Sequence, residues 1–406
     1  MAQDFTVDRN SSKWVLGSDG FLKEYANDEA AIEFNADGSY KGVLVEPESV
    51  NESLQSEGLD NATYWNVFRA TIATDTETEP KGGTNSFLLS ETVDNLSHGI
   101  SIQFAQQPSI GSGETWTMSI FVKKGDGANA PDIVQLANTN AFGTNYANFD
   151  ISVGGGTSGT VTDSTGGTGR IRYYGNGWYR ISWTTTSTGA GTALVRMYFT
   201  NDNPTATVAP TYAGQTDANV FIWGAQLEES PIATSYIPTT TGAVTRLKDD
   251  IYLTSASSLI GQTEGTMFVE VDWQGVTGQL QYLLQVSNGT DDDRVALFVN
   301  TSNELRMLAV VNAGFPFTVN QGVSGSSFTG IQKIAYAYKT NDFELYRNGS
   351  SVSTDTSGSL ASLATLTDIG FAQKDDDASA QANMWIRAVA LFTTRLSDPE
   401  CEALTT

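Results

Sequence analysis

Alternating apolar and polar positions recur along most of this chain, and a helical repeat is nearly absent. Segment 116–123 reads WTMSIFVK, so every second side chain from Trp116 to Val122 is apolar and mostly polar side chains lie between them. One apolar and one wetter face are typical of a strand in a β-sandwich. Segment 220–227, VFIWGAQL, is largely apolar on both faces and predicts a strand buried on two sides, or one that closes a sandwich.

Segments of strand character, separated by clusters of Gly, Asn, Asp and Pro, predict an all-β fold. In the first half of the chain they lie at 86–89, 99–104, 116–123, 133–136, 148–153, 170–174, 178–185, 193–200 and 220–227. In the second half they lie at 266–273, 282–286, 296–300, 305–311, 332–338, 343–347, 368–371 and 384–392. We therefore expect two tandem antiparallel β-sandwiches.

Turn signals and prolines divide the chain further. Asp-Gly pairs at 19–20 and 37–38 predict two small hairpins. Pro231, Pro238 and the polar run 239–242 cannot continue a strand ladder, and 406 residues suit two hydrophobic cores. The expected division is a β-rich leader at 1–48, a sandwich at 49–240, a linker at 241–262 and a second sandwich at 263–406.

The two sandwiches match one another weakly at three places in the same order, at offsets of roughly 150 to 165 residues. The matched pairs are 114–120 with 264–270, 177–183 with 330–336, and 223–227 with 387–391. This order predicts that the two sandwiches share a fold.

Charge and cysteine content narrow the function classes. The chain has 22 basic and 46 acidic residues, a formal charge of −24. Such a charge repels phosphate backbones, so we expect no nucleic-acid partner. One cysteine, Cys401, rules out an internal disulfide. The first residues lack the apolar core of a signal peptide, and no window approaches the roughly 20 apolar residues of a membrane helix, so we expect no membrane insertion.

Catalytic patterns are sparse. His98 is the single histidine, which leaves little for histidine-dependent acyl transfer or for zinc sites of the Cys/His kind. We expect His98 to pack in a turn. Glu270 and Asp272 supply two acids of the three-acid strand pattern of glycosidases, and the third is missing. We expect a protein that is not an enzyme, with a glycosidase, or a polysaccharide lyase using tyrosine and basic residues, as the open alternative.

Two loops have the composition of glycan-binding loops, which combine aromatic rings with amide groups. One is 138–148, with Phe142, Asn145 and Tyr146 as candidates, and the other is 312–317, with Phe315 and Phe317. The alternative is that these rings anchor their loops to the core.

A cation site is a further candidate. The aspartate run 291–293 offers the oxygen ligands that Ca²⁺ prefers, with Asp291 and Asp293 as its candidate ligands. The competing interpretation is a solvated turn, and no other cofactor is expected.

Segment 224–246, GAQLEESPIATSYIPTTTGAVTR, resembles a segment common in tailed-phage virion proteins, as do 42–47, 114–123 and 177–181. The resemblance spans most of the first 250 residues, although 48–51 keep only the asparagine of that family's usual Arg-Thr-Asn. It implies a first domain similar to carbohydrate-binding sandwiches.

The second domain resembles concanavalin A-like and laminin G-like folds through ELYRNG at 344–349 and through 385–404. Within the latter, Ser397, Pro399 and Glu400 predict a short capped terminal helix. The expected fold class is therefore all-β, with two tandem jelly-roll, concanavalin A-like sandwiches behind a short β-rich leader.

By this resemblance the chain is expected to be a virion surface protein, made in the host cytoplasm, that attaches a phage to its host as a tail fibre or another appendage by binding a glycan. Expected partners are other virion subunits, contacted through the leader, and a host glycan. A homo-oligomer, by resemblance a trimer, is expected as well. The alternatives are a purely structural decoration or connector subunit and a polysaccharide depolymerase.

Overall fold

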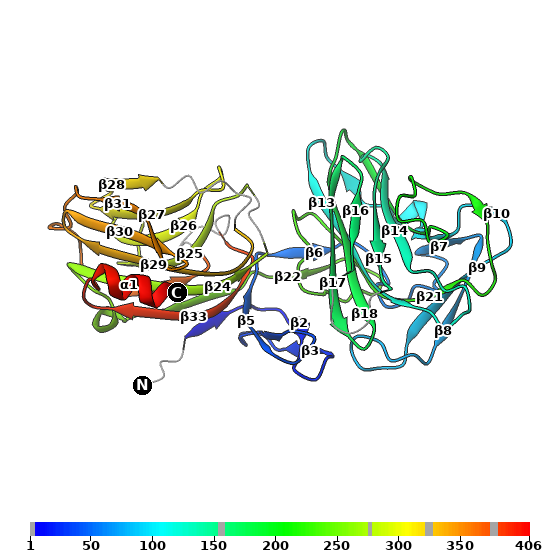
Figure 1. Cartoon of the computed structure of the whole chain (residues 1–406), viewed down its shortest axis with the longest axis horizontal. Coiled ribbons are helices and arrows are strands. Elements are labelled where there is room, and N and C mark those ends of the chain that lie inside the picture. Colours follow the sequence, from blue (N-terminus) through cyan, green and yellow to red (C-terminus); the bar gives the residue numbers. More distant parts are fainter. Residues whose placement is uncertain (1–4, 153–158, 275–277, 321–327, 374–380) are drawn as a thin grey trace.

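The protein folds as two antiparallel β-sandwiches with one short α-helix near the C-terminus, as Figure 1 shows. The computed structural model describes residues 5–152, 159–274, 278–320, 328–373 and 381–406; for 315–320 it describes the backbone alone. The all-β fold class is confirmed. None of the helices within these ranges has the length and apolar character needed to cross a membrane.

The first sandwich packs two sheets around one apolar core. One sheet runs β17 (Gly167–Gly175), β18 (Trp178–Thr186), β13 (Thr115–Lys124), β21 (Asn219–Glu228), β9 (Ser86–Glu91) and β8 (Ala70–Asp75). The other runs β16 (Val161–Asp163), β15 (Asn145–Asp150), β14 (Ile133–Asn140), β19 (Gly191–Phe199), β11 (Gly99–Ile102) and β7 (Trp65–Phe68), with β12 (Ser109–Ile110) beside β19. A small pair, β10 (Asn95–Leu96) and β20 (Tyr212–Ala213), and the 3₁₀ turn η1 (Phe104–Gln106) complete it. The alternate apolar side chains of β13, from Trp116 to Val122, lie in this core as predicted.

The second sandwich has the same two-layer build. One sheet runs β31 (Ser350–Asp355), β30 (Asp342–Arg347), β29 (Gly330–Lys339), β24 (Glu264–Trp273), β33 (Met384–Phe392), β5 (Tyr40–Val45) and β4 (Ile32–Phe34). The other runs β1 (Thr6–Asp8), β23 (Asp250–Leu253), β32 (Asp368–Phe371), β25 (Gln281–Ser287), β26 (Arg294–Val299), β27 (Leu305–Val311) and β28 (Gly314–Asn320). The 3₁₀ turn η2 (Ser257–Leu259) follows β23. On β24, Val269 and Val271 enter the core while Glu270 and Asp272 face outward, as the alternation predicts.

The leader contributes strands to the second sandwich rather than standing apart. β1 pairs with β23, and β5 pairs with β33 so that Leu44 lies opposite Trp385. Only the hairpin of β2 (Lys13–Leu16) and β3 (Leu22–Tyr25) stays outside these sheets. In Figure 1 this hairpin lies between the two sandwiches. The first sandwich is therefore inserted between two parts of the second.

The chain passes between the sandwiches twice, and the two passages pair with one another. β6 (Ser49–Asn51) leads into the first sandwich and β22 (Val244–Arg246) leads out, and they form a two-stranded ladder. The range 241–262, expected to be a linker, thus contains β22 and β23, which belong to ladders.

The expected common fold of the two sandwiches is visible in the strand order. β18, β13 and β21 lie side by side in the first sandwich as β29, β24 and β33 do in the second. Both central strands carry a register shift at the matched position, between Ser119 and Phe121 in one and between Glu270 and Val271 in the other. Beyond β21 lies the β9–β8 hairpin, and beyond β33 lies the leader's β5–β4 hairpin.

The turn and cap predictions are confirmed. Gly20 and Gly38 have φ angles of 82° and 80° in their hairpins, a backbone region that favours glycine. Asn348 and Gly349 both have positive φ between β30 and β31, as a type I′ turn requires. α1 (Asp398–Thr405) begins with a capping box made by Ser397 and Glu400.

Candidate functional site

The first predicted glycan loop is the hairpin between β14 and β15. Phe142 has no exposed surface and lies in the core of the first sandwich, so its assignment as a sugar-stacking ring is wrong. Asn145 and Tyr146 are half-buried, and the Asn145 amide donates to the Phe142 carbonyl oxygen at 3.0 Å. The aromatic ring anchors the hairpin, which was the competing interpretation.

The other sequence candidates lie in the second sandwich. Phe315 and Phe317 are on strand β28, and their side chains fall outside the described residues. Asp291 forms an ion pair with Arg294. The buried Asp293 accepts hydrogen bonds from the backbone amides of Asn312 and Ala364 at 3.2 and 3.1 Å.

These two aspartates therefore hold loops together. Within the part of the chain that the structure describes, no three Asp, Glu, His or Cys side chains gather as a metal site. His98 is buried, and its two ring nitrogens lie 2.7 and 3.4 Å from the carbonyl oxygens of Arg69 and Tyr212, as expected of a packed histidine.

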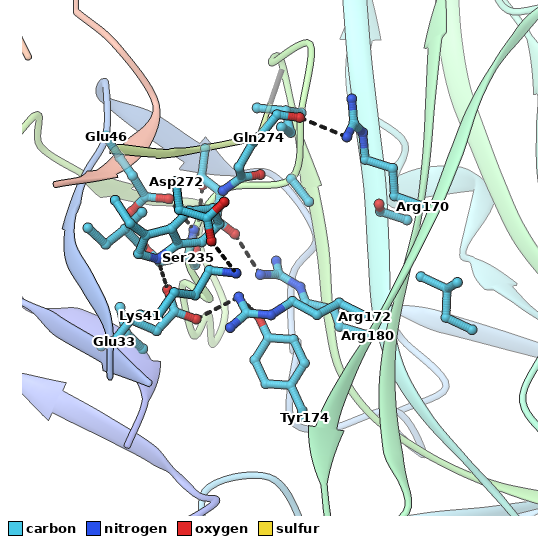
Figure 2. A pocket seen from close by; sticks show the side chains of 18 of the residues that line it. Glu33, Lys41, Glu46, Arg170, Arg172, Tyr174, Arg180, Ser235, Asp272 and Gln274 are labelled. Carbon is cyan, nitrogen blue, oxygen red and sulfur yellow. Dashed lines mark hydrogen bonds and ion pairs between the residues drawn. The ribbon is translucent and has the colours of Figure 1, made fainter. Parts of the chain in front are cut away.

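A cavity of about 540 Å³ lies where the leader, the first sandwich and the second sandwich meet, and we call it the junction pocket. The first sandwich supplies β17, β18 and the loop 232–235; the leader supplies β5 and its neighbours; the second sandwich supplies the ends of β24 and β33. Figure 2 shows polar side chains from all three parts turned toward one another there.

Three of the chain's twelve arginines line this pocket from two adjacent strands. Arg170 and Arg172 alternate with Ile171 on β17, so the arginines share the outer face of the sheet while Ile171 packs on the core. Arg180 on β18 lies directly opposite Arg172 in the ladder. Like charges placed directly opposite destabilise a ladder, so this face needs compensating anions.

The leader and the second sandwich supply two of those anions. Glu33 accepts from Arg172 at 2.6 Å and from the Trp385 indole N–H at 2.6 Å. Asp272, at the end of β24, lies 3.6 Å from the Lys41 ammonium. The pocket thus joins two cations and two carboxylates in one network.

Burial and neighbouring charge shift the pKa values in this network. Burial lowers the pKa of the Arg172 guanidinium, but Glu33, together with Tyr174 and Asp272, more than offsets burial and holds this pKa above its usual range. Burial, and next the Arg172 cation, lower the pKa of Lys41, while Glu33 and Asp272 act in the other direction.

Two arginines of the pocket have no carboxylate partner among the described residues. Arg180 donates to the Thr234 carbonyl oxygen at 2.6 Å and to the Ser119 hydroxyl at 2.9 Å, and its buried Nε has no partner. Arg170 donates to the carbonyl oxygen of Gln274 at 2.9 Å.

Exposure falls from the rim of the pocket to its floor. Arg170 is exposed, the Arg172 side chain is 29% exposed and Lys41 is 13% exposed. Arg180 is 6% exposed. A ligand that enters past Arg170 would therefore meet hydrogen-bond donors that are less and less exposed to solvent.

Three of the four aromatic side chains that line the pocket have a cation over the ring. Lys41 lies 3.8 Å from the centre of the Trp385 ring, and Arg172 lies 4.7 Å from that of Tyr174. Lys81 lies 4.3 Å from that of Trp14. Cation–π contacts of this kind stabilise the cations, and the pocket offers charge and hydrogen-bond donors more than free rings.

A buried hub of charges lies behind the pocket. The Glu46 carboxylate forms an ion pair with the Lys13 ammonium at 3.0 Å and accepts a hydrogen bond from the Ser235 amide at 2.7 Å. Burial raises the pKa of Glu46, but Lys13 and Arg246 outweigh it and lower the pKa to about 2. Glu46 stays ionised and fastens the leader to the loop that lines the pocket.

Polar side chains of segment 224–246 form the hydrogen bonds that shape the loop beside the junction pocket. Glu228 accepts from the Thr234 amide at 3.0 Å and from its hydroxyl at 2.6 Å, and Gln226 accepts from the Ile237 amide at 2.8 Å. Buried Asn51 donates to the carbonyl oxygens of Ala225 and Ile237 at 3.2 and 2.7 Å. These side chains hold the loop 232–237 in place.

Sequence reasoning missed the junction pocket. Its one local signal was the alternation of arginines at 170 and 172 with apolar residues, in a chain poor in basic residues. Lys41, Asp272 and Trp385 are too far apart in sequence for any spacing rule to join them.

No family model and no curated protein matches the sequence. Among solved structures, a sialidase carbohydrate-binding module (CBM40) of Ruminococcus gnavus aligns with 37% of this chain and 87% of its own, at 17% identity and a TM-score of 0.32. Botulinum neurotoxin type C aligns with 39% of each chain at 16% identity and a TM-score of 0.33. The sialidase of Trypanosoma rangeli aligns with 83% of this chain and 52% of its own at 11% identity and a TM-score of 0.32. Superpositions this loose do not identify a ligand.

Proposed function

We propose that this chain binds a saccharide in the junction pocket and, as a surface part of a tailed-phage particle, attaches the particle to its host. The observation that supports it most is the pocket itself, which offers about 540 Å³ and several inward-directed polar side chains. A concave site with a few convergent polar groups is the usual form of a small-ligand site. The resemblance of segment 224–246 to phage virion proteins supplies the biological setting.

The pocket suits binding better than catalysis. Of the three carboxylates in its lining, Glu33 and Asp272 are engaged by basic side chains at 2.6 and 3.6 Å, and Glu46 lies 3.0 Å from the Lys13 ammonium. A general acid in a glycosidase must hold a proton near neutral pH, and a nearby cation favours the ionised form. We therefore propose attachment without cleavage.

The partners follow from the same proposal. The host contributes a surface glycan, and the virion contributes neighbouring subunits. Because the leader's strands are engaged with the second sandwich, contact with other subunits would use the leader's outward side, where Phe5 and Tyr40 are exposed. Light scattering on the purified chain would test the trimer expected by resemblance.

A glycan array probed with the purified protein tests the proposal, together with adsorption of particles that lack the protein. We expect binding to a restricted set of glycans and loss of adsorption. Absence of binding combined with normal adsorption would contradict the proposal. So would the release of new reducing ends from the bound polysaccharide, which would identify a depolymerase.

A further inference from the structure

We infer that the sugar held in the junction pocket carries a carboxylate, which the cations on the pocket's inner surface receive. This inference rests on the proposed function and adds the chemical class of the ligand. Four basic side chains and three acidic ones line the pocket of a chain whose formal charge is −24. One of the acids, Glu46, is already bound by Lys13 and Arg246 behind the pocket. The pocket is therefore a positive region on an acidic protein.

The first argument is the unsatisfied donor capacity at the floor. Arg180 is 6% exposed, carries a full charge and has no carboxylate partner within the described residues, and its Nε has no partner at all. Buried donors of this kind cost free energy until an acceptor arrives. A carboxylate has the acceptor oxygens and the planar geometry that a guanidinium matches.

The second argument is the state of the aromatic rings. Neutral sugars are commonly held by stacking on open aromatic faces, yet Lys41 covers Trp385 and Arg172 covers Tyr174. These contacts place the cations where they point into the pocket, as Figure 2 shows for Lys41 and Arg172. Charge is the main attraction that the pocket offers, so an acidic sugar gains more there than a neutral one.

The third argument limits the density of charge on the ligand. A formal charge of −24 repels a polyanion over about one Debye length, ~8 Å at physiological salt. A pocket with a small excess of positive charge can offset this repulsion for one or two carboxylates. We expect a terminal or widely spaced acidic sugar and no binding of densely sulfated chains.

The test uses two pairs of ligands that differ in the carboxylate. One pair is sialyllactose and lactose, and the other is trigalacturonic acid and its carboxyl-reduced neutral form. Titration calorimetry on the full chain should give at least tenfold tighter binding of the acidic member of at least one pair, because a charged hydrogen bond contributes enough for that ratio.

Two variants locate the effect, and one matched variant controls for charge. Arg170→Gln removes the exposed arginine at the rim, and Ser235→Ala removes a hydroxyl of the pocket lining. Both should weaken binding of the acidic ligand several-fold, and the melting temperature of each variant shows that it stays folded. Arg196→Gln is the control, because it removes one arginine charge from β19, outside the pocket lining. Arg196 donates to the Tyr198 hydroxyl, as Arg172 in the pocket donates to the Tyr174 hydroxyl.

Each outcome decides a different claim. Equal binding of acidic and neutral members, unchanged by Arg170→Gln and Ser235→Ala, would overturn the inference while leaving glycan binding intact. Binding of sulfated glycans in place of carboxylated ones would also overturn it. Failure of every glycan on an array to bind would remove the proposed function itself. Arg196→Gln weakening binding as much as Arg170→Gln would show a general charge effect and overturn the pocket assignment.

Discussion

Five charged side chains with almost no exposed surface lie where the leader meets the second crossing between the sandwiches. Asp249 accepts from Arg9 at 2.7 Å and from Lys13 at 2.5 Å, while Glu46 lies 3.0 Å from Lys13 and 3.7 Å from Arg246. Removing one partner from such a cluster strands a buried charge, which costs more than a surface pair contributes. At the scale of single residues, this cluster fixes the geometry behind the pocket.

Glu46 should make the protein sensitive to acid. Its pKa is lowered from 4.5 to about 2 in the folded state. A lowered carboxyl pKa contributes stability that is present above the unfolded value and is lost as the pH falls toward 2. The shift corresponds to about 3 kcal/mol. Chemical denaturation between pH 6 and pH 2.5 should show this loss.

The variant Glu46→Gln isolates that contribution. It should unfold more easily at pH 7 and lose less stability than the native chain as the pH falls to 2.5. Glu48→Gln is the control, because the Glu48 side chain is exposed and lies two residues further along the chain. Its stability should follow the native pH profile. Parallel profiles for the native chain and Glu46→Gln would contradict this account of the hub.

Position 224, the first of segment 224–246, requires a glycine. Its φ is +61°, at the register shift between β13 and β21, and an added Cβ would lie 3.0 Å from the Phe121 ring and 3.3 Å from Tyr236. The left-handed backbone alone costs an ordinary residue ~1–2 kcal/mol. Gly224→Ala should therefore lower the free energy of unfolding in urea by at least that amount.

Gly242→Ala is the matched control, because no atom lies within 4 Å of its added Cβ. It should leave the unfolding free energy nearly unchanged. Equal effects of the two substitutions would mean that the bulge does not constrain position 224.

At the scale of elements, the leader's hairpins occupy in the second sandwich the places that local strands occupy in the first. β5 extends the sheet beyond β33 as β9 does beyond β21, and β1 lies beyond β23 as β7 does beyond β11. An edge strand with unpaired backbone groups is unstable and prone to wrong pairing. The leader therefore completes the second sandwich, whose other strands begin some 200 residues later with β23 (Asp250–Leu253). The pairing of β1 with β23 shows this directly.

Deletion of residues 1–45 should consequently damage the second sandwich and spare the sheet of the first sandwich that contains β14 and β19. β33 would lose β5 at Met384–Ile386 and keep β24 there, and Asp249 would lose both Arg9 and Lys13. Hydrogen exchange should accelerate at least tenfold in β23 and β33 and stay unchanged in β14 and β19. Unchanged protection throughout the chain would indicate an independent leader and contradict the pairing.

The strands and turns were predictable from the sequence because their rules are local. The Asp-Gly hairpins, the alternation on β24 and the Ser397 cap need only neighbouring residues, and each is confirmed. The pairing of Leu44 with Trp385 is not local, since alternation identifies a strand without naming its partner. The prediction that Phe142 binds a glycan was wrong for a related reason. An aromatic side chain in a polar loop can point toward solvent or into the core, and Phe142 points into the core.

At the scale of the whole molecule, the junction pocket exists because two sandwiches and a leader are held in one arrangement. Arg170 contacts the Gln274 carbonyl oxygen across the sandwiches, and Arg172 contacts Glu33 of the leader. The remaining protein is strongly acidic, with a formal charge of −24. A basic pocket in that setting could be found only after the chain's distant segments were placed together.

The most direct measurement is an experimental structure of the full chain bound to the tightest ligand from a glycan array. The account predicts saccharide density in the junction pocket, with ligand oxygen atoms within hydrogen-bond distance of Arg180 and Arg170. Density at the 138–148 hairpin with the pocket unoccupied would contradict it.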